Sequence, residues 1–139
     1  MEAAAARVAA RTSRVQEVLR GMSVAQKARQ IDMIYGNQEL LANGALNSTA
    51  LAYYLATGGI SIVHDLYDPG IGGSIINTLQ AATLNATGVP IMFVEEGLHG
   101  LLQAGKTVFP QSIAMAASFD RGLMQATAAA IAAESRAYG

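Results

Sequence analysis

Short apolar runs alternate with longer segments of helical spacing along the chain. Three runs have the length and composition of buried strands: Ile31–Tyr35, Ile60–Val63 and Val89–Val94. Glycine or polar residues follow each of them. Because strands that alternate with helices form βαβ units, the pattern predicts an α/β fold with parallel strands and crossover helices.

Five segments have the apolar spacing or the flanking residues of helices. Ser23 can cap the second of them, Asn47 or Ser48 the third and Ser74 the fourth. Gly88 is placed to end the fourth. The predicted helices are Ala3–Leu19, Val24–Arg29, Thr49–Ala56, Ile75–Asn85 and Arg121–Tyr138.

The remaining segments carry turn and loop signals. Asn43 and Gly44 form a dipeptide that is typical of tight turns. Glycines and a proline predict a loop at Leu66–Gly73, and we expect another at Lys106–Pro110. The small residues of Gln111–Ser118 are expected to form one further short strand.

The stretch Val89–Phe109 carries the strongest signal for a functional site. Its apolar run ends directly in two carboxylates, Glu95 and Glu96, and a glycine-flanked segment around His99 follows. In parallel sheets and barrels, working residues lie where strands pass into loops at the carboxyl end. We therefore expect the site at the end of this strand.

Composition narrows the range of partners. The chain has 139 residues, of which 52% are hydrophobic and 14% charged, whereas an average domain has about 25% charged residues. The low fraction of charged residues indicates that part of the surface is covered by further polypeptide chain or by a partner. A net charge of −1 and the absence of basic runs longer than two residues argue against nucleic acid. The absence of cysteine excludes disulfides and thiolate metal sites.

No targeting segment is visible. The apolar run Ala3–Ala6 is too short for a secretory signal, and Arg7 interrupts it. No stretch approaches the roughly 20 apolar residues of a membrane span. We therefore expect no membrane partner and leave the localisation unassigned.

A series of short motifs runs in one order along most of the chain. The site segment reads Glu96-Gly97-Leu98-His99-Gly100. The other motifs are Val15–Ser23, Gly59–Ile62, Asn77–Gln80, Gly88–Ile91, Thr107–Gln111, Ala116–Asp120 and Glu134–Gly139. Taken in this order, from about Val15 to Gly139, they resemble the N-terminal domain of glycoside hydrolase family 3, the family of β-glucosidases and β-xylosidases.

The resemblance implies a (β/α)8 barrel of the TIM type, and a complete barrel takes about 250 residues. Residues 1–139 would then be about the first half of that barrel domain, truncated at its C-terminal side. The resemblance places the nucleophilic Asp and the acid/base carboxylate beyond Gly139. We therefore expect a fragment, a truncated gene model or one half of a split protein, inactive by itself.

The resemblance also implies a role for Glu96. In the family, the acid three residues before the motif's histidine binds hydroxyls of the sugar in the subsite where cleavage occurs. Most β-glucosidases of the family carry Asp at this position, and Glu resembles the xylosidase-like and related branches. The preferred sugar therefore stays open.

The residues around Glu96 have their own alternatives. Retaining glycosidases need two carboxyls about 5–5.5 Å apart. Neighbours in a regular strand face opposite sides, so Glu95 and Glu96 are a poor catalytic pair, and Glu95 is expected only to support the site. His99 could be a general base, but we favour a structural role in which its ring nitrogens fix a loop, with Gly100 as a further supporting residue.

Other polar residues are weaker candidates. His64 and Asp65 could form a metal or acid–base pair, but two residues are too few for a zinc site, and we favour loop capping. The run Gly70–Ser74 lacks the lysine of a phosphate-binding loop. Glu134 and Arg136 are expected to form surface or interface ion pairs. We expect neither a metal nor a cofactor.

Two function hypotheses follow. In the first, the chain is part of a retaining β-glycosidase of carbohydrate metabolism that hydrolyses O-glycosyl bonds at non-reducing ends of β-linked glycosides or oligosaccharides. In the second, it is a non-catalytic half-barrel that binds sugar or associates with a partner. That partner is the missing C-terminal half or a second copy, since an open half-barrel leaves strand edges unpaired. Coding sequence beyond Gly139 would discriminate between them.

Overall fold

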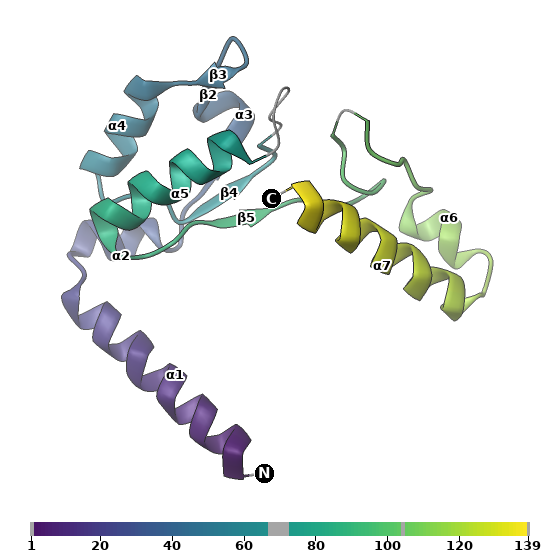
Figure 1. Cartoon of the computed structure of the whole chain (residues 1–139), viewed down its shortest axis with the longest axis horizontal. Helices are drawn as coiled ribbons and strands as arrows, with labels where there is room; N and C mark the ends of the chain where they lie inside the picture. The colour runs from purple at the N-terminus through teal and green to yellow at the C-terminus, as the bar shows by residue number, and fades with distance from the viewer. Residues whose placement is uncertain (1, 67–72, 104, 139) are drawn as a thin grey trace.

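The computed structural model describes residues 2–66, 73–103 and 105–138, and its architecture is α/β (Figure 1). Three short strands form a parallel sheet in the order β1-β4-β5. These strands are β1 (Met33–Tyr35), β4 (Ile62–His64) and β5 (Met92–Val94). Helices separate them along the chain. The predicted α/β class with parallel strands is confirmed.

All five predicted helices are present, with ends that shift by a few residues at most. They are α1 (Glu2–Gly21), α2 (Val24–Arg29), α4 (Ser48–Ala56), α5 (Ser74–Thr87) and α7 (Arg121–Tyr138). Ser23 and Gln26 form a capping box at the start of α2, and the Asn47 side chain caps α4. Gly88 ends α5 in the left-handed conformation that a helix C-terminus favours.

Two expectations about local structure were wrong. The segment Gln111–Ser118 contains a short helix, α6 (Ser112–Ala116), instead of a strand; its alanines favour helix. Ser74 is the first residue of α5 and not its cap. Gly73 occupies the cap position with φ 87°, a conformation that suits glycine, so the chain enters the helix one residue earlier than expected.

The strands are shorter than the apolar runs that predicted them. Ile31 is 89% exposed and precedes β1, while His64 belongs to β4. A short helix α3 (Gly36–Glu39) and a hairpin of β2 (Leu41–Ala42) and β3 (Ala45–Leu46) were not predicted. Asn43 and Gly44 form the two-residue turn of that hairpin, both with positive φ, as in type I′ turns. Most of the predicted Leu66–Gly73 loop lies outside the described residues.

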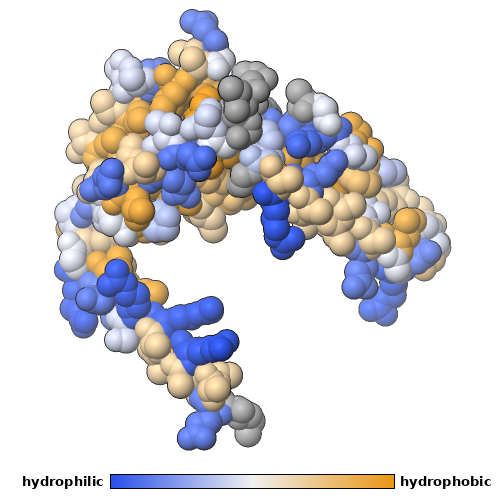
Figure 2. Space-filling model, in the orientation of Figure 1, coloured by the Kyte–Doolittle hydropathy of each residue, from blue (hydrophilic) through white to orange (hydrophobic). Residues whose placement is uncertain are grey.

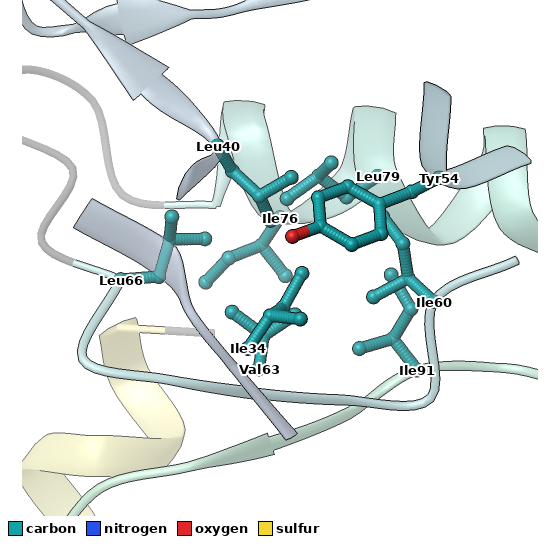
Figure 3. Packing of buried hydrophobic residues seen from close by; sticks show 9 residues of the cluster. All are labelled: Ile34, Leu40, Tyr54, Ile60, Val63, Leu66, Ile76, Leu79 and Ile91. Carbon is teal, nitrogen blue, oxygen red and sulfur yellow. The ribbon is translucent and has the colours of Figure 1, made fainter. Parts of the chain in front are cut away.

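One face of the sheet packs against helices to form the core (Figure 3). The central residues of the strands, Ile34, Val63 and Phe93, lie side by side in the register. Helices α4 and α5 contact each other and contribute Tyr54 and Leu79 to the same cluster. The buried cluster consists of Ile34, Leu40, Tyr54, Ile60, Val63, Leu66, Ile76, Leu79 and Ile91.

The opposite face of the sheet is open. Side chains alternate between the two faces of a strand, so the residues before and after each central residue lie on this second face. Met33 is 53% and Met92 56% exposed, and Val94 is also exposed. Apolar side chains that stay half in water on a sheet face indicate a surface that lacks its covering layer.

Helices α1 and α7 extend from opposite sides of the sheet region (Figure 1). Both expose apolar side chains such as Val8, Val15 and Leu123 among their charged residues (Figure 2). Within the described part of the chain, no helix combines the length and the apolar character that crossing a membrane requires.

Gln80 of α5 fixes the start of the strand that leads to the candidate site. Its side-chain amide donates to the Ile91 carbonyl at 2.8 Å and accepts from the Ile91 N–H at 2.9 Å. The amide thus pairs with Ile91 as a neighbouring strand would. Gln80 belongs to the motif Asn77–Gln80, and its contact with Ile91 explains structurally why the motif contains a glutamine.

We expect Gln80→Leu to lower the free energy of unfolding by about 2–4 kcal/mol, because it leaves two backbone groups of the buried Ile91 without their partner. Urea unfolding measures this loss. Gln125→Leu makes the same change on an exposed position of α7 and should have little effect. Equal stability of the two variants would contradict the role of Gln80.

Candidate functional site

Polar side chains gather at the carboxyl end of the parallel sheet. Tyr35 ends β1, His64 ends β4, and the two residues are paired in the register. Asp65 follows β4 directly, and Glu95 and Glu96 follow β5. Because the three strands are parallel, the polar residues at their carboxyl ends lie at one edge of the sheet. Parallel α/β proteins place their functional sites at this edge.

Glu95 and Glu96 differ in their surroundings. Glu95 is half-buried and borders a cavity of about 260 Å³, whose other walls are mainly apolar. Those walls are Leu66, Ile76, Phe93, Leu101, Ser135 and Tyr138. Glu96 is exposed. Glu95, Glu96 and Asp65 also line a second and smaller depression of about 40 Å³, large enough for a water molecule.

The pKa of Glu95 is raised from 4.5 to about 7, chiefly by burial. The neighbouring Asp65 carboxyl, through hydrogen bonding and its negative charge, and the nearby Glu96 contribute to this increase. A hydrogen bond from the Leu66 backbone N–H opposes the shift. A substantial fraction of Glu95 is therefore protonated at neutral pH and can donate a hydrogen bond.

His64 and Asp65 are neighbours in space as well as in sequence. The His64 Nδ1 lies 3.3 Å from the Asp65 Oδ2, and the His64 ring stacks on Tyr35 with centroids 4.9 Å apart. Asp65 has a backbone φ of 50°, a value that residues other than glycine rarely adopt. Within the described ranges, no three His, Asp or Glu side chains are grouped to hold a metal ion.

His99 and Gly100 close the loop that follows Glu96. The His99 Nδ1 lies 3.0 Å from the Phe109 carbonyl oxygen, and the Phe109 N–H donates to the His99 carbonyl at 2.9 Å. A Cβ at Gly100 would lie 2.8 Å from both the Phe109 ring and the Thr107 carbonyl, and φ is 86°. The histidine ring thus holds the loop at the edge of the site, and the close approach requires glycine.

Helix α7 binds the same loop. The Thr107 hydroxyl donates to the Glu134 Oε1 at 2.8 Å, and the Thr107 N–H points at the same carboxylate. Glu134 was expected to form surface or interface ion pairs, and among the described residues its carboxylate accepts hydrogen bonds from Thr107. The contact joins two of the sequence motifs, Thr107–Gln111 and Glu134–Gly139.

Two features of the carboxyl edge of the sheet were not predicted from the sequence. Tyr35 was treated only as the end of a strand, although an aromatic residue at that position could have been flagged as His64 was. Asp65 and Glu95 are 30 residues apart in the sequence but line the same depression, and no pattern within one segment of the sequence predicts that they meet there.

The parallel sheet and its acidic edge define the class: an α/β protein with carboxylates at the strand ends. Residues 23–139 match the family model described as Glycosyl hydrolase family 3 N terminal domain. The chain belongs to this family, as the motifs indicated, although the match begins at Ser23 and not at Val15. No curated protein and no solved structure matched the chain.

Proposed function

We propose that the chain contributes the sugar-binding side of a retaining β-glycosidase that hydrolyses O-glycosyl bonds at non-reducing sugar ends. Family membership supports glycoside hydrolysis as the reaction class. The observation that carries the proposal is the position of Glu96, which is exposed at the carboxyl edge of the sheet within the family motif. An exposed carboxylate there can accept hydrogen bonds from two neighbouring sugar hydroxyls.

The proposed architecture is about the first half of a (β/α)8 barrel. In such a barrel, helices cover the outer face of the strands and side chains of other strands fill the inside. The sheet has this asymmetry: α4 and α5 contribute to the buried core on one face, whereas Met33 and Met92 are half exposed on the other. Closing the barrel would bury this open face.

The catalytic pair is proposed to come from residues outside these 139. Retaining hydrolysis needs a nucleophilic carboxylate and an acid/base about 5–5.5 Å apart across the scissile bond. Glu95 and Glu96 are not proposed as this pair, because neighbouring residues at a strand end face opposite sides of the sheet. Glu96 alone can hold the sugar but cannot supply both functions.

The experiment uses the polypeptide made from the natural gene, assayed on p-nitrophenyl β-D-glucoside and β-D-xyloside with the α-glucoside as control. We expect hydrolysis of at least one β-glycoside, and NMR of the first product should show the β anomer. Faster hydrolysis of the xyloside would agree with Glu at position 96. Inversion of configuration would contradict the retaining mechanism. Sugar binding without hydrolysis would favour a non-catalytic binding module instead.

A further inference from the structure

We propose that Tyr35 and His64 form a second sugar contact in the site of Glu96, in which the Tyr35 hydroxyl and the His64 Nε2 bind sugar hydroxyls that Glu96 leaves free. The inference rests on the proposed function, because it adds two residues to the same sugar site. It assigns part of the specificity of that site to the carboxyl ends of β1 and β4.

The open face of the sheet carries two rows of side chains that differ in character. The strand register gives the first row three apolar side chains, Met33, Ile62 and Met92. It gives the last row, at the carboxyl end, two polar rings and one valine, Tyr35, His64 and Val94. Apolar side chains suit the filled interior of a barrel, whereas polar groups without partners are costly there. In the proposed barrel, the polar row lies at the mouth, where the site is.

The last row places the two rings beside Glu96. Val94 pairs with His64 in the register, and Glu96 follows Val94 by two residues. Neighbouring strands lie about 4.8 Å apart. His64 is therefore one strand spacing, and Tyr35 two spacings, from the strand that leads to Glu96. A sugar held by Glu96 over the ends of β4 and β5 has the two rings along its other side.

The two rings present their edges to the space above the open face. Their centroids are 4.9 Å apart, and their planes differ by 14°. Side chains of a strand stand roughly perpendicular to the sheet, so rings that stack across neighbouring strands turn their faces toward each other and their edges away from the sheet. The edges carry the Tyr35 hydroxyl and the His64 ring nitrogens, which form hydrogen bonds with hydroxyl groups.

Asp65 determines which nitrogen of His64 faces the sugar. The His64 Nδ1 lies 3.3 Å from the Asp65 Oδ2, so this nitrogen is directed at the carboxylate and the Nε2 is left for another partner. The His64 side chain is 29% exposed, and Tyr35 is also half-buried. Both rings are therefore held by their neighbours and are still accessible from the open face.

Contacts of the neighbouring chain fix both strand ends before any sugar binds. The Tyr35 N–H donates to the Glu39 Oε1 at 2.8 Å, and the Tyr54 hydroxyl donates to the Glu39 Oε2. The Asn37 N–H donates to the Asp65 carbonyl at 3.1 Å, which joins the segment after β1 to the segment after β4. Because these contacts need no ligand, the two rings are preorganised, and a sugar binds with little further ordering.

The experiment compares the natural polypeptide with its Tyr35→Phe, His64→Asn, Glu96→Ala and Tyr53→Phe variants. Phenylalanine at position 35 keeps the ring and removes only the hydroxyl. Asparagine at position 64 keeps a polar group near the Nδ1 position and removes the Nε2. Tyr53 is 59% exposed on α4 and is the matched control for the loss of a hydroxyl. Kinetics use the better of p-nitrophenyl β-D-glucoside and β-D-xyloside, together with analogues that each lack one ring hydroxyl.

We expect Tyr35→Phe and His64→Asn each to lower kcat/KM about 3- to 10-fold on the complete sugar, as the loss of one hydrogen bond predicts. Tyr53→Phe should match the parent, and Tyr35→Phe should keep the melting temperature of the parent. The loss in Tyr35→Phe should disappear on the one analogue that lacks the hydroxyl bound by Tyr35 and persist on the others, because the same hydrogen bond is lost only once.

Three results would overturn the proposal, each in a different way. A variant that keeps the kcat/KM of the parent removes its residue from the site, while a large loss in Glu96→Ala leaves the proposed function standing. Equal losses of Tyr35→Phe on the complete sugar and on every analogue would assign the ring a structural role only. If the parent hydrolyses neither β-glycoside, the proposed function fails and the second sugar contact fails with it.

Discussion

Glu96→Ala is expected to lower kcat/KM for β-glycosides by about 10²- to 10³-fold in the polypeptide made from the natural gene, because a charged hydrogen-bond partner of the reacting sugar is lost. Contacts to ring hydroxyls strengthen as the sugar distorts toward the transition state, so kcat should fall as well as substrate affinity. Steady-state kinetics on the better of the β-glucoside and the β-xyloside measure both.

The matched control is Glu17→Ala, which removes an exposed glutamate far along the chain, on α1. Because Glu96 is exposed and borders only a small depression, its loss should leave thermal stability nearly unchanged. Unchanged kcat/KM in Glu96→Ala would remove this residue from the site. A large fall in melting temperature would instead assign it a structural role.

Residues 1–139, expressed alone, should self-associate and hydrolyse no glycoside. The sheet ends at β1 and β5, whose outer edges have no partner strand among the described residues. Its open face adds half-exposed Met33 and Met92. Light scattering after gel filtration should therefore show dimers or larger species, and chromogenic β-glycosides should stay intact.

A charge on the open face tests this explanation. Met92→Lys should shift the isolated chain toward monomer, because burying a lysine against another apolar face is costly. Val24→Lys places the same charge on α2, where Val24 is 84% exposed, and should leave the association unchanged. A monomeric parent chain that unfolds cooperatively and hydrolyses a β-glycoside would contradict the half-barrel account.

Signals contained within one short segment predicted local structure well. Ser23 and Asn47 marked two helix starts because capping depends on a side chain and the next three backbone amides. Gly88 marked a helix end for a similarly local reason. The helix within Gln111–Ser118 was not predicted, because its small residues show no clear periodicity. The high helix propensity of alanine accounts for α6.

The direction of the strands predicted that the site lies at the carboxyl edge of the sheet. The contacts among the residues at that edge could not be predicted from the sequence. A run of apolar residues followed by Glu95 and Glu96 placed two carboxylates at a strand end. Their different environments depend on the cavity between the sheet, α5 and α7, which no single segment contains. The same applies to the Gln80 contact with Ile91, where a helix residue completes the hydrogen bonds of a strand.

The most direct test of the account is to locate a bound sugar in a crystal structure of the natural polypeptide with a β-glucoside or β-xyloside. The account predicts the non-reducing sugar at the carboxyl edge of the sheet, with Glu96 oxygens about 2.5–2.8 Å from two adjacent hydroxyl oxygens. A sugar bound elsewhere, or one at this edge that leaves Glu96 in solvent, would contradict it.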